Sequence, residues 1–120
     1  MAEKLVFLMT HGPDHEEHAT IPFVMAVAAL SSDVEAVIGL QADAVSLAKK
    51  GTAETVVATG FPPLTKLIGD FRELGGKLLV CTPCLKCRGI EPEQLIEGVE
   101  LVAAGRFVVE VTSATNVLTY

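Results

Sequence analysis

Short, mostly apolar runs of strand length alternate with helical patterns along this chain, and this alternation most constrains the fold. Residues 4–9, 34–40 and 77–80 are such runs, shorter than a typical buried helix. In residues 64–74 the apolar side chains instead recur at helical spacing, and a pair of glycines follows. Strands that alternate with helices predict an α/β fold with a mainly parallel sheet.

Four other segments have less definite patterns. Residues 14–30 predict a helix in which Pro22 causes either a kink or a later start. Residues 42–50 predict a short helix closed by a glycine, and residues 91–97 predict another that starts near a proline. Residues 52–62 fit either a long ordered loop or a short edge strand, because strand-forming residues are soon followed by Gly and Pro.

Length and composition indicate a single domain with a large apolar surface to bury. The chain has 120 residues, a size typical of one domain, so we expect residues 1–120 to form a single unit. Half of the residues are hydrophobic and only 20% are charged. A parallel sheet covered on both faces and a subunit that buries a further face in a homo-oligomer both fit this composition, and we expect both.

Charge and hydropathy patterns exclude several functional classes. The net charge of −6 and the lack of a basic block argue against nucleic-acid binding. The longest purely apolar run, residues 23–30, is far shorter than the ~18 residues that indicate a membrane span. The first residues do not form a convincing signal peptide. We therefore expect a cytoplasmic protein, where clustered cysteines are more often catalytic or metal-binding than structural.

All three cysteines lie in one short segment with the spacing C-x2-C-x2-C: Cys81, Cys84 and Cys87. They directly follow the apolar run 77–80, and functional groups in parallel α/β sheets gather beyond the carboxyl ends of strands. Lys86 and Arg88 lie nearby and favour thiolate over thiol. We therefore expect a functional cysteine loop, rather than three small buried apolar side chains.

Three kinds of chemistry fit this loop. Cys81 and Cys84 have the C-x-x-C spacing of a dithiol redox pair, although the motif comes late in the chain and no tryptophan precedes it. Zinc or an iron–sulfur cluster usually takes four ligands, so His11 would complete a set only if its loop lay beside the cysteines. The third possibility is persulfide or thiosulfonate chemistry, in which one cysteine carries sulfur and its neighbours resolve it. We expect no metal.

Residues after the first two strands are candidates for the same site. His11 and Gly12 follow the first strand, and Gln41 ends the second, so each is expected to contact substrate at this edge. His11 is suited to holding an anionic sulfur species, but an exposed loop histidine fits equally well. Asp43 fits either the same cleft or a helix N-cap. Phosphate-binding glycine motifs are absent from the sequence, so no cofactor is expected.

The chain resembles the DsrE family (DsrE/DsrF-like proteins) along nearly its whole length. The segments that carry the resemblance are residues 4–13, 22–26, 74–81, 84–89, 97–102 and 117–120, in this order. The resemblance implies a flavodoxin-like three-layer α/β sandwich with a five-stranded parallel sheet, assembled as trimers or hexamers. It also implies that residues 103–113 are helical, although residues 107–111 have the composition of a strand.

The family resemblance also implies sulfur relay, in which a cysteine accepts sulfur from one carrier and passes it to another, often a TusA-like protein. Cys84 matches the family's reactive cysteine, whereas Cys87 departs from the usual pattern. Our leading hypothesis is an intracellular carrier with Cys84 as nucleophile, Cys81 or Cys87 as resolving thiol, and Lys86 and Arg88 as anion-stabilising groups. A thiol-disulfide or peroxide-reducing protein and a metal-binding or structural oligomer are the alternatives. Whether the protein is an enzyme stays open.

Overall fold

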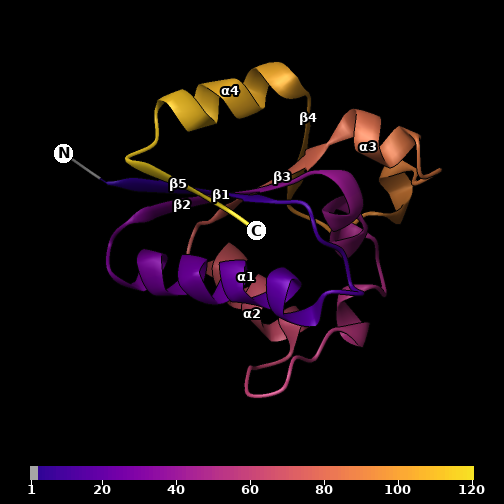
Figure 1. Cartoon of the computed structure of the whole chain (residues 1–120), viewed down its shortest axis with the longest axis horizontal. Helices are drawn as coiled ribbons and strands as arrows, with labels where there is room; N and C mark the ends of the chain where they lie inside the picture. The colour runs from indigo at the N-terminus through magenta and orange to yellow at the C-terminus, as the bar shows by residue number, and fades with distance from the viewer. Residues whose placement is uncertain (1–2) are drawn as a thin grey trace.

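Five parallel strands form the centre of the molecule, in the order β4-β3-β2-β1-β5 (Figure 1). The computed structural model describes residues 3–120, so the first two residues of the predicted domain lie outside the described part. The strands are β1 (Lys4–Met9), β2 (Glu35–Leu40), β3 (Lys77–Cys81), β4 (Val99–Val102) and β5 (Asn116–Thr119). The three apolar runs that predicted strands are β1, β2 and β3.

Helices cover both faces of the sheet and complete a three-layer sandwich, which confirms the predicted α/β fold class. The helices are α1 (Glu16–Ser31), α2 (Leu64–Glu73), α3 (Thr82–Lys86) and α4 (Ala104–Thr112). Figure 1 shows α1 and α2 on one face and α4 on the other. Connections between parallel strands are right-handed, so the direction in which the chain moves across the sheet decides which face the connecting helix covers. The chain moves in one direction from β1 to β3 and in the opposite direction from β4 to β5, which places α4 on the face opposite α1 and α2.

The face under α1 and α2 carries the larger apolar core. Phe7 of β1, Phe23 of α1 and Phe71 of α2 are fully buried, and the rings of Phe23 and Phe71 pack edge to face with centroids 5.6 Å apart. The opposite face has a smaller core, in which Phe107 of α4 packs over β2 at Gly39. A Cβ on Gly39 would lie 2.6 Å from the Phe107 ring, so glycine at this position lets α4 approach the sheet.

The structure settles the four less definite segments. Helix α1 continues through Pro22. Of the predicted helix 42–50, only Ala42–Ala48 are helical, as the 3-10 helix η1, and the segment 91–97 contains only the short 3-10 helix η3 (Pro92–Gln94). Residues 52–62 form a loop with one 3-10 turn, η2 (Ala53–Thr55), and no strand. Among the described residues 3–120, no helix is long and apolar enough to span a membrane.

Helix α4 confirms the helical expectation for residues 103–113, against the strand composition of its valines. Phe107 and Glu110 are buried, one helical turn apart, whereas Val108 and Val109 are 60% and 59% exposed. Burial of one helical face therefore outweighs local strand propensity. The exposed valines add apolar surface of the kind that a homo-oligomer would bury, and oligomerisation stays a prediction.

Candidate thiol site at the carboxyl edge of the sheet

The three cysteines lie on a strand end and a short helix, and not on the open loop that the sequence predicted. Cys81 is the last residue of β3 and the N-cap of α3, Cys84 lies within α3, and Cys87 is its C-cap. Pro83 occupies the first turn of α3, where the lack of an N–H is tolerated and the fixed φ favours helix. Residues three apart lie on the same side of a helical turn, so the C-x2-C spacing brings successive cysteines close together.

The sulfur atoms of Cys81 and Cys84 lie 2.9 Å apart, within hydrogen-bonding reach of each other. Both side chains are half-buried and pack against the larger core. Burial raises the pKa of the Cys81 thiol, and the contact with Cys84 raises it further. Cys81 therefore keeps its proton at neutral pH.

The backbone of Ala42 supplies a polar contact to Cys84. The Ala42 N–H donates a hydrogen bond to Cys84 Sγ over 3.3 Å. Ala42 lies two residues after the end of β2, and β2 pairs in parallel with β3, so the two strand ends meet at this edge. Ala42 has φ +50°, a left-handed conformation that costs about 1–2 kcal/mol for a residue with a Cβ. Backbone strain of this kind concentrates at functional sites.

Cys87 is exposed and contacts Arg88 instead of the other sulfurs. Arg88 Nη1 donates to Cys87 Sγ over 3.1 Å and to the Cys84 carbonyl oxygen over 3.2 Å. The other side of the guanidinium binds Asp43 Oδ1, with Nε at 3.1 Å and Nη2 at 2.7 Å. This hydrogen bond to Asp43 raises the pKa of Arg88 further, so the side chain is always charged. Arg88 thus links the cysteine helix to the segment after β2.

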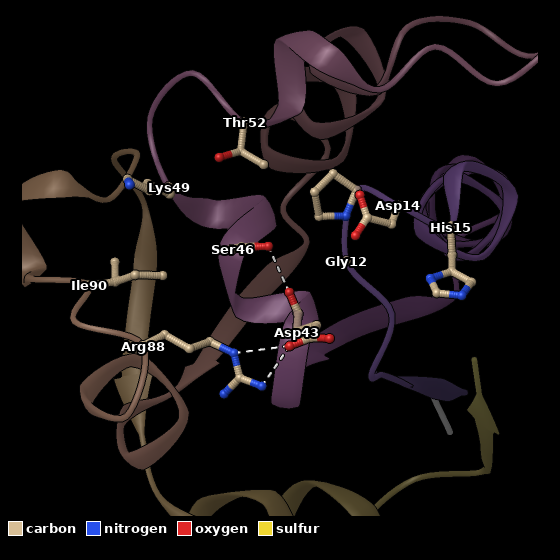
Figure 2. A pocket seen from close by; sticks show the side chains of 10 residues that line it. Gly12, Asp14, His15, Asp43, Ser46, Lys49, Thr52, Arg88 and Ile90 are labelled. Atoms are coloured by element: carbon tan, nitrogen blue, oxygen red, sulfur yellow. Dashed lines mark hydrogen bonds and ion pairs between the residues drawn. The ribbon is translucent and has the colours of Figure 1, made fainter.

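A pocket of about 440 Å³ opens beside this link. Figure 2 shows Arg88 and Asp43 pointing toward each other across part of it. The lining residues are Gly12, Pro13, Asp14, His15, Asp43, Ser46, Lys49, Thr52, Arg88 and Ile90. Two cations and two hydroxyl groups in one hollow are suited to a small anion, although the two carboxylates offset part of the positive charge.

The other residues predicted to contact substrate lie at three different places. Gly12 lines the pocket and permits a close backbone approach, because a Cβ there would lie 2.8 Å from the Asp43 carbonyl oxygen. Gln41 is the half-buried N-cap of η1. Lys86 is exposed at the end of α3 and lines a second hollow of about 300 Å³, with Thr82 and Leu85.

His11 lies in a group of three histidines and not among the cysteines. Its ring centroid is 4.4 Å from that of His18 and 4.8 Å from that of His15. Its Nδ1 is buried without a hydrogen-bond partner in the described part of the chain. Within residues 3–120, no three His, Cys, Asp or Glu side chains are arranged to hold a metal ion. His11 therefore does not complete a metal-ligand set with the three cysteines.

Asp43 lines the pocket, one of the two roles that the sequence suggested for it, but sequence reasoning missed the other contributions of the segment after β2. Ser46, Lys49 and Thr52 line the pocket, and the Ala42 N–H reaches Cys84. The available signal was the position of this segment at the carboxyl end of a predicted parallel strand, the edge at which ligand groups gather. The contacts themselves connect residues more than 40 positions apart, and no local pattern predicts such contacts.

Taken together, the carboxyl edge holds two thiols in contact, a third exposed thiol beside a guanidinium, and an adjacent pocket with two cations. Sulfur nucleophiles of this kind react with disulfides, persulfides and peroxides.

Several known proteins are similar to this chain, and two of those compared are uncharacterized proteins of Methanocaldococcus jannaschii. MJ0989 is 32% identical over 117 residues, which cover 98% of this chain and 99% of the relative. MJ0760 is 35% identical over 105 residues, which cover 88% of this chain but only 38% of the relative. The chain therefore matches less than two fifths of the length of MJ0760.

Solved structures with low sequence identity share the fold. The ychN protein of E. coli superimposes with a TM-score of 0.83 at 22% identity, covering 98% of this chain and 99% of that one. The protein of unknown function MTH1491 from Methanobacterium thermoautotrophicum gives 0.74 at 15% identity, with 98% and 99% coverage.

The family model of the DsrE/DsrF-like family matches residues 3–120, which confirms the resemblance found in the sequence motifs. The chain therefore belongs to the DsrE/DsrF-like family.

Proposed function

We propose that this protein is a sulfur carrier that holds sulfane sulfur on Cys84, as a persulfide or a thiosulfonate. Membership of the DsrE/DsrF-like family supports a sulfur-relay type of protein. The observation that carries the assignment to Cys84 is the position of its sulfur, 2.9 Å from Cys81 Sγ and 3.3 Å from the Ala42 N–H. Within residues 3–120, no backbone N–H donates to Cys87 Sγ, and Cys87 is exposed to solvent.

The loading step is a transfer of one sulfur atom without net oxidation. The Cys84 sulfur attacks the outer sulfur of a persulfide or polysulfide donor, and the bond between the two donor sulfurs breaks. The donor leaves with the proton that Cys84 gives up, as a thiol from a persulfide or as a shorter polysulfide or hydrogen sulfide from a polysulfide, and Cys84 gains a sulfur–sulfur bond. The Ala42 N–H faces Cys84 Sγ, on which negative charge develops later, when an acceptor thiol takes the sulfane sulfur and the bond to Cys84 breaks.

The pocket beside the cysteines supplies the contacts for the donor or its anionic cargo. Arg88 and Lys49 provide positive charge there, and Arg88 also contacts the backbone of Cys84. Gly12 shapes the pocket by allowing the close approach to Asp43. His11, Gln41 and Lys86 lie outside the pocket lining, so a substrate contact for them requires a bound partner that reaches further along this edge.

The physiological setting of this proposal is a cytoplasmic homo-oligomer, a trimer or hexamer of single DsrE-like domains. A small sulfur-carrier protein, such as a TusA-like protein, is the acceptor that we expect. Its thiol attacks the sulfane sulfur on Cys84 and leaves Cys84 as a free thiol again. The exposed Cys87 and Lys86 lie where a docked partner protein would approach α3.

A thiol-disulfide redox protein is the second candidate, and the Cys81–Cys84 contact of 2.9 Å favours it. Such a protein would cycle between the dithiol and a disulfide without carrying sulfur. Rapid reduction of peroxide with a dithiol as electron source, and no sulfur adduct after exposure to polysulfide, would favour this function over sulfur transfer.

Intact-mass measurement tests the carrier directly. The reduced protein is exposed to inorganic polysulfide without oxygen, in the wild type and in Cys84→Ser and Cys87→Ser. We expect the wild type and Cys87→Ser to gain the mass of one sulfur atom, and Cys84→Ser to gain none. Addition of a thiol acceptor then restores the original mass and converts the acceptor into a persulfide.

The matched control is the Cys87→Ser variant, because it removes the more exposed thiol by the same isosteric change. An adduct that forms on Cys84→Ser as readily as on the wild type would overturn the assignment to Cys84.

A further inference from the structure

The contact between Cys81 and Cys84 is not needed to load or to unload sulfur. A carrier requires one nucleophilic thiol, a donor and an acceptor, and the Ala42 N–H already orients the Cys84 sulfur. Yet Cys81 places a second sulfur 2.9 Å from the first. Once Cys84 carries a sulfane sulfur, this second thiol is in position to attack Cys84 Sγ.

We propose that Cys81 is the resolving thiol of the loaded protein, which expels the carried sulfur from Cys84 as hydrogen sulfide when no acceptor takes it. This inference rests on the proposed function and adds a second fate for the bound sulfur. The protein would then release sulfide by itself and finish as a Cys81–Cys84 disulfide.

The step balances without an external oxidant. The Cys81 sulfur attacks Cys84 Sγ, a Cys81–Cys84 bond forms, and the bond between Cys84 Sγ and the sulfane sulfur breaks. The sulfane sulfur leaves with the electron pair of the broken bond and takes up the proton of Cys81, so the products are a disulfide and hydrogen sulfide. The sulfane sulfur is reduced and the two cysteines are oxidised. A dithiol reductant is needed only to restore the two free thiols.

The two sulfurs are held in place by regular structure and need no hinge motion to meet. Cys81 ends β3 and is in register with Val102 of β4, and Cys84 lies in the helix that starts at the next residue. Both side chains also pack against the larger core. In-line displacement then requires only that the sulfane sulfur occupy the side of Cys84 Sγ away from Cys81.

Cys87 is a poorer resolving thiol, despite its exposure. Its sulfur faces the Cys84 carbonyl oxygen at 3.4 Å and Arg88 Nη1 at 3.1 Å, and these contacts hold it toward the backbone and the guanidinium. The Cys84 sulfur instead contacts Cys81 and the Ala42 N–H. Geometry therefore favours resolution by Cys81.

Because Cys81 is protonated, resolution is slow, and an acceptor thiol can take the sulfane sulfur from Cys84 first. Burial and the neighbouring Cys84 raise the pKa of Cys81, so at neutral pH its sulfur is mostly a protonated, weakly nucleophilic thiol. Resolution should be slow near pH 7 and should accelerate as the pH rises past the ordinary cysteine pKa of about 8.5. Transfer to an acceptor with a more acidic thiol then outcompetes resolution at neutral pH.

The test follows sulfur after loading. Reduced wild type, Cys81→Ser and Cys87→Ser are loaded with inorganic polysulfide without oxygen, desalted and left without an acceptor. We expect the wild type and Cys87→Ser to lose the added sulfur, release one sulfide per chain, and end lighter than the reduced protein by two hydrogens. Cys81→Ser should keep its adduct. If wild-type resolution is over before the first time point, a wild-type disulfide beside a persistent Cys81→Ser adduct gives the same conclusion.

Two outcomes would overturn the inference: an adduct on Cys81→Ser that decays as fast as on the wild type, or wild-type sulfide release that does not accelerate from pH 7 to pH above about 8.5. Either result leaves the carrier function intact, because an adduct has formed. If Cys81→Ser forms no adduct on Cys84 while its circular dichroism and unfolding transition match the wild type, the carrier function itself fails, and this inference fails with it. Cys81→Ala repeats the comparison without a hydroxyl group at the site.

Discussion

The polar groups at the amino edge of the sheet form ion pairs, whereas those at the carboxyl edge are thiols that contact each other and a main-chain N–H. At the amino end of β1, Lys4 Nζ lies 2.5 Å from Glu110 Oε1, and Arg106 Nε lies 2.6 Å from Glu110 Oε2. Arg106 also binds Glu100 at 2.8 Å, so each of these charges has an opposite charge beside it. At the carboxyl edge, the thiols of Cys81 and Cys84 contact each other, and a left-handed alanine supplies the main-chain donor.

The difference separates a region that holds α4 on the sheet from a region suited to chemistry. The amino-edge network pairs its charges and buries the Glu110 side chain to 7% exposure, an arrangement that stabilises one packing of α4. The carboxyl edge contains local strain at Ala42 and thiols that an incoming electrophile can reach. Substitutions at the amino edge should therefore change stability without changing sulfur chemistry, whereas substitutions of the cysteines or of Arg88 at the carboxyl edge should change sulfur chemistry.

The largest expected effect on stability is that of Glu110→Gln. The change leaves Lys4 half-buried without its counter-charge and weakens the hold of Arg106 on α4. We expect the free energy of unfolding to fall by about 2–3 kcal/mol, less than the roughly 3–5 kcal/mol for a fully buried pair, because both cations keep some access to water. Urea denaturation measures this loss. Sulfur loading of the folded variant should match the wild type, and a loading defect would contradict the separation of the two edges.

The pH dependence of stability sharpens the same contrast. Burial alone would raise the pKa of Glu110, but hydrogen bonds from Lys4 and Arg106 outweigh it and lower the pKa below its ordinary value of about 4.3. Because the folded-state pKa is depressed, the contribution of Glu110 is present above about pH 4.3 and is lost as the pH falls through the folded-state pKa. The stability difference between wild type and Glu110→Gln should therefore shrink below about pH 4. A constant difference across this window would contradict the assignment.

Arg88→Lys tests the carboxyl edge with an intermediate effect. Lysine keeps the charge but loses the planar fork that contacts Asp43, Cys87 Sγ and the Cys84 carbonyl oxygen at the same time. We expect the rate of sulfur loading to fall roughly 2- to 5-fold, in line with the modest energy of an exposed charged contact. Stopped mass measurements at fixed polysulfide give the rate. Lys66→Arg, at an exposed position of α2 that does not line the pocket, is the matched control and should load at the wild-type rate.

The smallest expected effect is that of Ala42→Gly. Glycine removes the steric cost of the left-handed conformation but makes the unfolded chain more flexible, so we expect a net stabilisation of only about 0.5 kcal/mol. The backbone N–H that contacts Cys84 is retained, so loading should not change. Ala42→Val is the opposing control, because a β-branched residue fits this conformation poorly and should destabilise the protein. Equal stability of the two variants would show that Ala42 carries no strain.

The sequence predicted which segments form strands and helices better than it predicted the order of the strands in the sheet. Apolar runs identified β1, β2 and β3, because strands buried on both faces carry few polar residues. Helix α4 came only from the family resemblance, since Val108, Val109 and Val111 favour a strand locally and their helical state depends on the packing of Phe107. The position of β5 beside β1 is a long-range pairing that no local pattern encodes.

The candidate site was likewise predicted in part. The spacing C-x2-C-x2-C identified the three cysteines and the strand end where they lie, because all of them belong to one continuous segment of the sequence. The contact from Ala42 and the Arg88–Asp43 pair depend on the adjacency of β2 and β3, so they emerge only in three dimensions. The helical state of the cysteine segment was missed for a different reason, since α3 is a single short turn with a proline in its first positions.

The most direct test of the account compares two single-cysteine variants, one that keeps only Cys84 and one that keeps only Cys87, as each takes up sulfur from polysulfide without oxygen. Exposure alone favours Cys87, whereas the contact from the Ala42 N–H favours Cys84. We expect the Cys84-only variant to gain the mass of one sulfur atom faster and to pass it to an acceptor thiol. Equal or faster uptake by the Cys87-only variant would contradict this expectation.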